Sequence, residues 1–126
     1  MKQMLTLLLL LSSTLATKTI KANLKNLNHA DQVTLGETFK IILESNPTTG
    51  FSWRLNYKPT SCESTNPDTF GEFTEPTTGF LGSPGKQTFT FQAKSQGVQE
   101  LIFIYERPWS HDDAITYRET ITVIQP

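Results

Sequence analysis

The stretch Phe-Ser-Trp-Arg-Leu-Asn-Tyr at residues 51–57 decides the fold, because its side chains alternate strictly between large apolar and polar types. Successive side chains of an extended chain point to opposite faces, so a period of two predicts a strand with one buried face. The same alternation occurs just upstream at residues 39–43 and again at residues 88–93. These three runs therefore predict a sheet protein with a substantial apolar core.

Further strands are predicted on both sides of these runs. Residues 98–106 are apolar on both faces, which is typical of a central strand, and the segment 114–125 is rich in Thr and Ile. Glu119 interrupts the apolar side of that segment, and we expect it at a bulge. Weaker strand patterns occupy residues 17–25, 32–35 and 70–74.

Turn-forming residues separate these runs, and no segment has a convincing helical period. Residues 28–31 (Asn-His-Ala-Asp) are expected to form one such turn, and Asn46-Pro47 and residues 82–85 (Gly-Ser-Pro-Gly) to form others. Seven or eight short strands with regular breaks predict an all-β fold, a single antiparallel β-sandwich.

The N-terminal segment has the layout of a secretory signal peptide. A short basic start is followed by a leucine-rich run at residues 4–11 and by small residues at 12–16. This run is far shorter than the roughly 20 apolar residues that a membrane-spanning helix needs. We expect cleavage after Ala16, with Thr14 or Ala22 as alternatives, and a mature domain of residues 17–126. Such a protein is secreted or resides in the lumen of lysosome- or phagosome-type vesicles.

Charge and cysteine content exclude several classes of partner and chemistry. The chain has 11 basic and 12 acidic residues and no basic run that would hold nucleic acid or a membrane surface. Cys62 is the only cysteine, so no intrachain disulfide forms, and we expect a partly buried bystander. Partner choice must therefore depend on shape and on particular side chains.

Catalytic and cofactor motifs are weak. His29 and His111, each expected in a polar turn, are not spaced as metal ligands with each other or with Cys62. A catalytic pair of Cys62 and His111 has no supporting local motif. The glycines at residues 79–85 do not form a phosphate loop, because Gln87 follows Lys86 where Ser or Thr is required. We expect no enzymatic activity, no cofactor and no metal.

One connection has a composition that an ordinary turn does not require. In Asn46-Pro47-Thr48-Thr49-Gly50 the proline restricts its own φ and the conformation of Asn46, whereas Gly50 permits a positive φ. Pro47 also blocks the glycosylation sequon at Asn46. The alternatives are a plain turn and a stiff, exposed binding loop with two hydroxyl side chains at its tip.

A second connection, Arg107-Pro108-Trp109, follows the central strand and carries two of the residue types enriched at binding hot spots. Trp109 either projects into solvent as a binding residue or folds back over the end of the sandwich. A third connection, at residues 82–85, has little side chain and would let another backbone approach closely.

Two motifs resemble the chagasin family of cysteine peptidase inhibitors: Asn-Pro-Thr-Thr-Gly-Phe-Ser-Trp at residues 46–53 and Tyr-Glu-Arg-Pro-Trp at residues 105–109. The resemblance covers essentially the whole mature chain, in order and at matching spacing. It implies an immunoglobulin-like sandwich whose three neighbouring loops form a wedge at one end. Pro84 stands where the family has glycine, which makes the third loop depart from the pattern.

The resemblance implies a function and a binding surface. The chain would be a reversible, tight-binding inhibitor of papain-like cysteine peptidases and would act as a monomer that occludes the active-site cleft. Phe51 and Trp53 would support the central loop from behind, mostly within the core. The peptidase-binding residues implied are Asn46, Pro47, Thr48, Thr49, Gly50, Phe51, Gly82, Ser83, Gly85, Arg107, Pro108 and Trp109.

The sequence also allows an alternative function and a pH-dependent affinity. A secreted sandwich that binds carbohydrate or a cell surface is the main alternative, with Trp109 stacking on a sugar ring. His111, just beyond the second motif, would make affinity depend on pH if it borders the enzyme.

Overall fold

The structure, a computed structural model, describes residues 17–56, 62–65, 69–75 and 85–126, apart from the side chain of Pro47. Nine strands occur within this part of the chain, together with one short 3₁₀ turn, η1 (Pro47–Thr49). The strands are β1 (Thr17–Lys21), β2 (Asn28–Thr34), β3 (Thr38–Ser45), β4 (Ser52–Leu55), β5 (Cys62–Ser64), β6 (Glu72–Thr74), β7 (Gly85–Ala93), β8 (Gly97–Arg107) and β9 (Ser110–Ile124).

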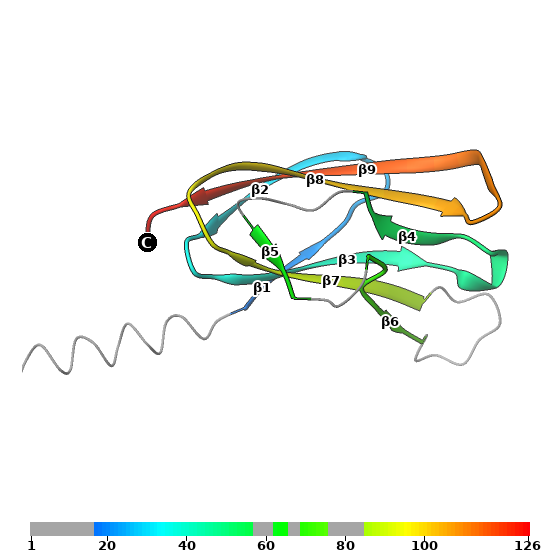
Figure 1. Cartoon of the computed structure of the whole chain (residues 1–126), viewed down its shortest axis with the longest axis horizontal. Coiled ribbons are helices and arrows are strands. Elements are labelled where there is room, and N and C mark those ends of the chain that lie inside the picture. Colours follow the sequence, from blue (N-terminus) through cyan, green and yellow to red (C-terminus); the bar gives the residue numbers. More distant parts are fainter. Residues whose placement is uncertain (1–16, 57–61, 66–68, 76–84) are drawn as a thin grey trace, which may run out of the picture.

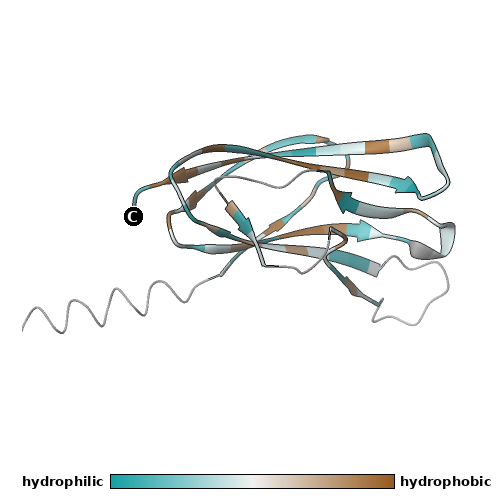
Figure 2. Ribbon diagram, viewed as in Figure 1, coloured by the Kyte–Doolittle hydropathy of each residue, from teal (hydrophilic) through white to brown (hydrophobic). Residues whose placement is uncertain are grey.

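The strands form two sheets that stack face to face, as Figure 1 shows. One sheet has the order β1-β3-β7-β5, with β6 also pairing with β7, and the other has the order β2-β9-β8-β4. The predicted all-β sandwich is therefore confirmed, and β8, predicted as a central strand, lies between β9 and β4. Figure 2 shows apolar and polar residues interspersed along the strands of both sheets.

Two pairings at the edges of the sheets are parallel, β1 with β3 and β2 with β9, whereas the sequence predicted antiparallel pairing throughout. The chain crosses to the other sheet to form β2 before it returns as β3. This long crossover lets β1 and β3 run in the same direction, which a tight hairpin does not allow.

The core is built from the inward-facing rows of both sheets, as the alternation predicted. Phe103 of β8 lies at its centre, with ring centroids 4.8 Å from Phe89, 6.5 Å from Phe91 and 6.3 Å from Tyr117. Full burial of each such side chain contributes about 1.5–3 kcal/mol to folding. The largest fully buried apolar side chains are Trp53, Tyr117, Phe39, Phe89, Phe91, Phe103, Ile41, Leu43, Leu101 and Ile121.

Residues 28–31, predicted as a turn, instead begin β2, and the short strand β5 was not predicted. Polar composition suggested a turn, but residues 28–31 pair with residues 118–121 of β9 along a regular ladder. The structure therefore has nine strands in its described part, against the seven or eight expected. Tertiary pairing outweighed local propensity at both places.

Glu119 does not lie at a bulge. It pairs in register with Leu101, and the irregularity in the β8–β9 ladder falls between Tyr105 and Arg107. The side chain of Glu119 occupies an inward position and is 0% exposed. The hydroxyl of Tyr117 donates a hydrogen bond of 2.8 Å to its Oε1, and burial raises the pKa of Glu119 to about 7. The polar residue that breaks the sequence pattern is thus part of the interior.

Cys62 is buried on β5, as expected for a bystander. Burial raises the pKa of its thiol to about 11, so the reactive thiolate is strongly disfavoured at neutral pH. No helix within the described residues is long and apolar enough to cross a membrane. The signal peptide predicted for residues 1–16 lies outside the described residues.

Candidate functional site

The first two candidate loops meet at one end of the sandwich. Residues 46–51, which include η1, connect β3 to β4, and residues 107–110 form the turn between β8 and β9. Both turns lie at the right-hand end of the molecule in Figure 1. Residues 107 and 46 are far apart in the sequence, and the antiparallel pairing of β4 with β8 brings the two segments together.

Side-chain hydrogen bonds close the loop at residues 46–50 on itself. The backbone carbonyl of Asn46 accepts from the amide of Thr49 at 3.2 Å and from the Thr49 hydroxyl at 2.7 Å. Thr48 Oγ1 donates to Asn46 Oδ1 at 2.7 Å, and the amide of Phe51 donates to Thr49 Oγ1 at 3.3 Å. Gly50 follows with φ +86°, in the left-handed region that favours glycine. The two threonine hydroxyls are therefore used to shape the loop.

Aromatic residues support this loop from behind. The amide of Asn46 donates to the Tyr105 hydroxyl at 3.0 Å. The Tyr105 ring stacks on Phe51 with centroids 5.2 Å apart and on Trp53 with centroids 4.8 Å apart. Trp53 is fully buried, and its Nε1 donates to the carbonyl of Glu44 at 2.8 Å. The expectation that Trp53 belongs to the core is confirmed, whereas Phe51 is half-buried at the surface.

Gln87, a buried residue that no sequence motif singled out, anchors both strands flanking the loop. Its Oε1 accepts from the amide of Trp53 at 2.7 Å and from Ser45 Oγ at 2.8 Å. Its Nε2 donates to the carbonyl of Trp53 at 2.8 Å and to that of Phe70 at 2.9 Å. The available signal was that Gln87 continues the inward-facing row of Phe89, Phe91 and Ala93 by one step, beyond the predicted run at residues 88–93.

Arg107 links the second loop to the first. Its Nε donates to the backbone carbonyl of Thr49 at 3.1 Å. Its guanidinium carbon lies 4.5 Å from the centroid of the Phe51 ring, within the range of a cation–π interaction. Arg107 therefore holds the tip of the first loop while remaining partly exposed itself.

Trp109 is 73% exposed and rests one edge of its indole on the first loop. A Cβ added to Gly50 would lie 2.7 Å from Trp109 Cη2 and 3.2 Å from Cζ2. The indole neither points freely into solvent nor folds into the core. The observed position of Trp109 is therefore intermediate between the two that the sequence suggested. Its exposed surface extends the surface of the first loop, next to the exposed residue Pro108.

A charged cluster lies just behind the second loop. Glu106, nearly buried, accepts from Arg54 Nε at 3.0 Å and pairs with His111 Nδ1 at 2.7 Å. The hydrogen bond with His111 and that with Arg54 lower the pKa of Glu106 below its ordinary value, against the opposing effect of burial. His111 lies on β9, not in the turn predicted for it, and it is largely exposed.

The third loop is described only at its end. Gly82 and Ser83, which the sequence implicated in binding, lie outside the described residues, as does Pro84. Gly85 is the first residue of β7, where it is buried and pairs with Ser45 at the end of β3. This position places the end of the third loop beside the start of the first.

Cys62 and His111, which the sequence allowed as a catalytic pair, do not lie together in the structure. Cys62 lies on β5 opposite Ala93, and His111 lies at the start of β9 in the other sheet, bound to Glu106. The described part of this end of the molecule presents threonine hydroxyls, backbone groups, an arginine and a tryptophan. Such a surface suits recognition of another protein.

Comparison with known proteins shows which protein family this chain matches. Residues 32–123 match the model of the chagasin family of peptidase inhibitors, I42. Chagasin from Trypanosoma cruzi is 36% identical over 86 residues, which cover 64% of this chain and 76% of chagasin. Amoebiasin-2 from Entamoeba histolytica is 31% identical over 110 residues, which cover 86% of each chain.

The fold has solved counterparts as well. The crystal structure of the cysteine protease inhibitor EhICP2 from Entamoeba histolytica superposes with a TM-score of 0.67 at 17% sequence identity, covering 86% of this chain and 96% of that one. Similarity at this level of identity shows that the two proteins share the sandwich fold.

Proposed function

Since this chain belongs to the chagasin family of peptidase inhibitors, we propose that it inhibits papain-like cysteine peptidases by placing residues 46–50 in the active-site cleft. Residues 107–109 would contact the enzyme beside the cleft, and the part of the third loop at residues 82–85 would contact it on the other side. The observation that carries the proposal is the continuous surface formed by Gly50 and the indole of Trp109, tied together through Arg107.

The conformation of the first loop explains how it would resist cleavage. A peptidase cuts a carbonyl that is held in line with its nucleophile, in a near-attack geometry. The carbonyls of Asn46 and Thr49 already accept hydrogen bonds from within the protein, and residues 47–49 form a tight 3₁₀ turn. Moving either carbonyl into line with the nucleophile would break those bonds.

The same bonds favour tight binding. A loop that is ordered before it docks loses little conformational entropy on binding, so more of the contact energy appears as affinity. Enzyme–inhibitor interfaces of this kind bury about 1,600 Å² in total. Three loops on a rigid sandwich could supply such an area. The proposed inhibitor would therefore act as a monomer and would need no cofactor.

The decisive experiment is titration of the purified domain, residues 17–126, against a panel of cysteine, serine and aspartic peptidases. Inhibition confined to papain-like enzymes, with the inhibitor recovered intact, would support the proposal. Rapid digestion of the domain, or undisturbed activity of every cysteine peptidase in the panel, would refute it.

A second candidate function is supported by the 73% exposure of Trp109, which is also compatible with a sugar-stacking residue. A carbohydrate-binding module would retain soluble glycans in an affinity assay and leave peptidases active. Saturable glycan binding that Trp109→Ala abolishes, without peptidase inhibition, would favour this alternative.

Export is proposed from the composition of residues 1–16, and the mature domain would act in the secretory pathway, outside the cell or in lysosome-type vesicles. Expression of the full chain in a eukaryotic secretion system should yield a product whose first residue is Thr17, followed by Lys18. N-terminal sequencing of the product tests this proposal, and a product that keeps residues 1–16 would contradict it.

A further inference from the structure

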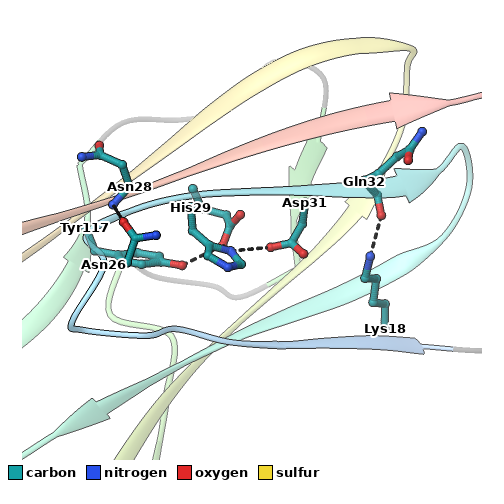
Figure 3. Close-up of polar contacts among 8 residues, drawn as sticks. Lys18, Asn26, Asn28, His29, Asp31, Gln32 and Tyr117 are labelled. Carbon is teal, nitrogen blue, oxygen red and sulfur yellow. Dashed lines mark hydrogen bonds and ion pairs between the residues drawn. The ribbon is translucent and has the colours of Figure 1, made fainter.

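A second cluster of polar side chains lies on β2 and β9, away from the loops. His29 and Asp31 come from β2, which pairs in parallel with β9, and His29 lies directly opposite Glu119. Figure 3 shows the His29 ring and the Asp31 carboxylate pointing toward each other, with Tyr117 approaching from β9. The proposed inhibition assigns no role to this cluster.

The spacing of these groups fits a metal ion. One ligand atom from each of His29, Asp31 and Glu119 lies within 4.8 Å of the other two. His29 Nδ1 is 2.8 Å from Asp31 Oδ2 and 3.5 Å from Glu119 Oε1. Zinc binds nitrogen and carboxylate oxygen at about 2.1 Å, which places tetrahedral ligands about 3.4 Å apart. Only small side-chain shifts would be needed to enclose the ion.

An independent observation is the state of the Glu119 carboxylate. Its side chain is 0% exposed, and its Oε2 has no hydrogen-bond partner among the residues that the structure describes. Its Oε1 lies toward His29 and accepts from the Tyr117 hydroxyl, so the carboxylate faces the cluster. A buried carboxylate oxygen without a partner is costly, and a cation held by both carboxylate oxygens of Glu119 would supply the partner that Oε2 lacks.

We propose that His29 Nδ1 and the carboxylates of Asp31 and Glu119 bind one Zn²⁺-type divalent transition ion. Zinc binds both imidazole nitrogen and carboxylate oxygen, and three protein ligands with water in the fourth position are the usual arrangement of an open zinc site. His29 and Asp31 are 36% and 22% exposed, so their side of the site is open to water. The Tyr117 hydroxyl would orient Glu119, as outer hydrogen bonds commonly do for metal ligands.

The donor set also selects among metals. Ca²⁺ and Mg²⁺ prefer sites made entirely of oxygen, whereas a nitrogen ligand favours zinc and its neighbours in the first transition row. Two carboxylates and a neutral imidazole would compensate the charge of a divalent ion. Binding would add a further link between the paired strands β2 and β9, and an ion that binds only the folded state stabilises it.

The site would act independently of inhibition. Along β8, six residues separate Arg107, which pairs with Ser110, from Leu101, which pairs with Glu119, so the cluster lies about 20 Å from the second loop at 3.3 Å per residue. Zinc is therefore expected to raise the unfolding temperature and to leave the inhibition constant unchanged. A protein that inhibits peptidases without binding zinc would contradict only the metal site, and one that binds zinc without inhibiting would contradict only the proposed function.

The test uses untagged residues 17–126, stripped with EDTA and titrated with ZnCl₂ by calorimetry at neutral pH. We expect one ion per chain and a higher unfolding temperature, with no comparable effect of CaCl₂ or MgCl₂. His29→Gln and Asp31→Asn, both at partly exposed positions, should each weaken zinc binding by at least about tenfold. Circular dichroism would confirm that both variants are folded.

His111→Gln is the matched control, because it removes the other histidine, which lies at the start of β9 and pairs with Glu106 of β8. It should bind zinc like the parent. A Co²⁺-loaded sample should show d–d absorption that His29→Gln alters and His111→Gln preserves. Absence of zinc binding by the parent, unchanged binding by His29→Gln, equal loss in His111→Gln, or equally tight Ca²⁺ binding would each overturn the proposal.

Discussion

The indole edge of Trp109 lies so close to the backbone of Gly50 that a single methyl group at residue 50 would come within 2.7 Å of Cη2. This contact joins two loops from distant parts of the chain into one surface. It also depends on the absence of a side chain at Gly50, whose φ of +86° is unfavourable for other residues.

Gly50→Ala is therefore expected to displace Trp109 and to weaken peptidase inhibition by at least about tenfold, about 1.4 kcal/mol. Gly36→Ala is the matched control, because Gly36 has a similar φ of +89° but nothing within 4 Å of its added Cβ. Both variants should lose about 1 kcal/mol of stability from backbone strain, and only Gly50→Ala should raise the inhibition constant. Equal inhibition constants would show that the contact with Trp109 is irrelevant to binding.

Trp109→Ala should weaken inhibition by about 2 kcal/mol or more, roughly thirtyfold, if the exposed indole is a binding hot spot. Stability should change little, because most of the side chain is already in water. Val98→Ala, which truncates another exposed apolar residue at the opposite end of β8, should change neither quantity. An inhibition constant unaffected by Trp109→Ala would remove this residue from the binding surface.

Gln87→Leu should lower the free energy of unfolding by about 2–3 kcal/mol, because it removes the buried side chain that binds both the amide and the carbonyl of Trp53. Chemical denaturation measures the loss. Gln92→Leu, on the same strand but at a more exposed position, should cost less than about 1 kcal/mol. Similar losses in the two variants would mean that the buried network is not what stabilises the base of the loop.

Glu106 should make stability depend on acidic pH. Its folded pKa is lower than the ordinary 4.5, so the stabilisation is present above that value and is lost as pH falls through the lower folded pKa. Denaturation measured between pH 7 and pH 3 should show a smaller loss for Glu106→Gln than for the parent. Glu100→Gln, which alters an exposed ion pair with Arg118, should follow the parent curve.

His111 lies beside the second loop, bound to Glu106, and is largely exposed. A histidine at the border of a bound enzyme makes affinity depend on pH between about pH 5 and 8. Inhibition constants measured at neutral and lysosomal pH should therefore differ less for His111→Ala than for the parent. Identical pH profiles would place His111 outside the interface.

Much of the candidate site could be anticipated from short motifs, because residues 46–53 and 105–109 carry unusual turn chemistry next to strongly patterned strands. The residues that support the site from behind could not be anticipated in this way. Gln87 interrupts an apolar row, and Glu106 is an ordinary charged residue in the sequence, yet each binds partners from a different strand. Their roles arise from pairings between strands, which residue spacing does not specify.

The sequence by itself determined which residues face the core, since a period of two assigns each strand residue to one side of a sheet whatever its partners. It also determined the local shape available to the loop at residues 46–50, through Pro47 and Gly50. Only the tertiary structure decided which strands pair, and in which direction. That pairing set Trp109 on Gly50, buried Glu119 opposite His29, and made residues 28–31 a strand, because hydrogen bonds between distant segments outweigh the local preference of a polar stretch.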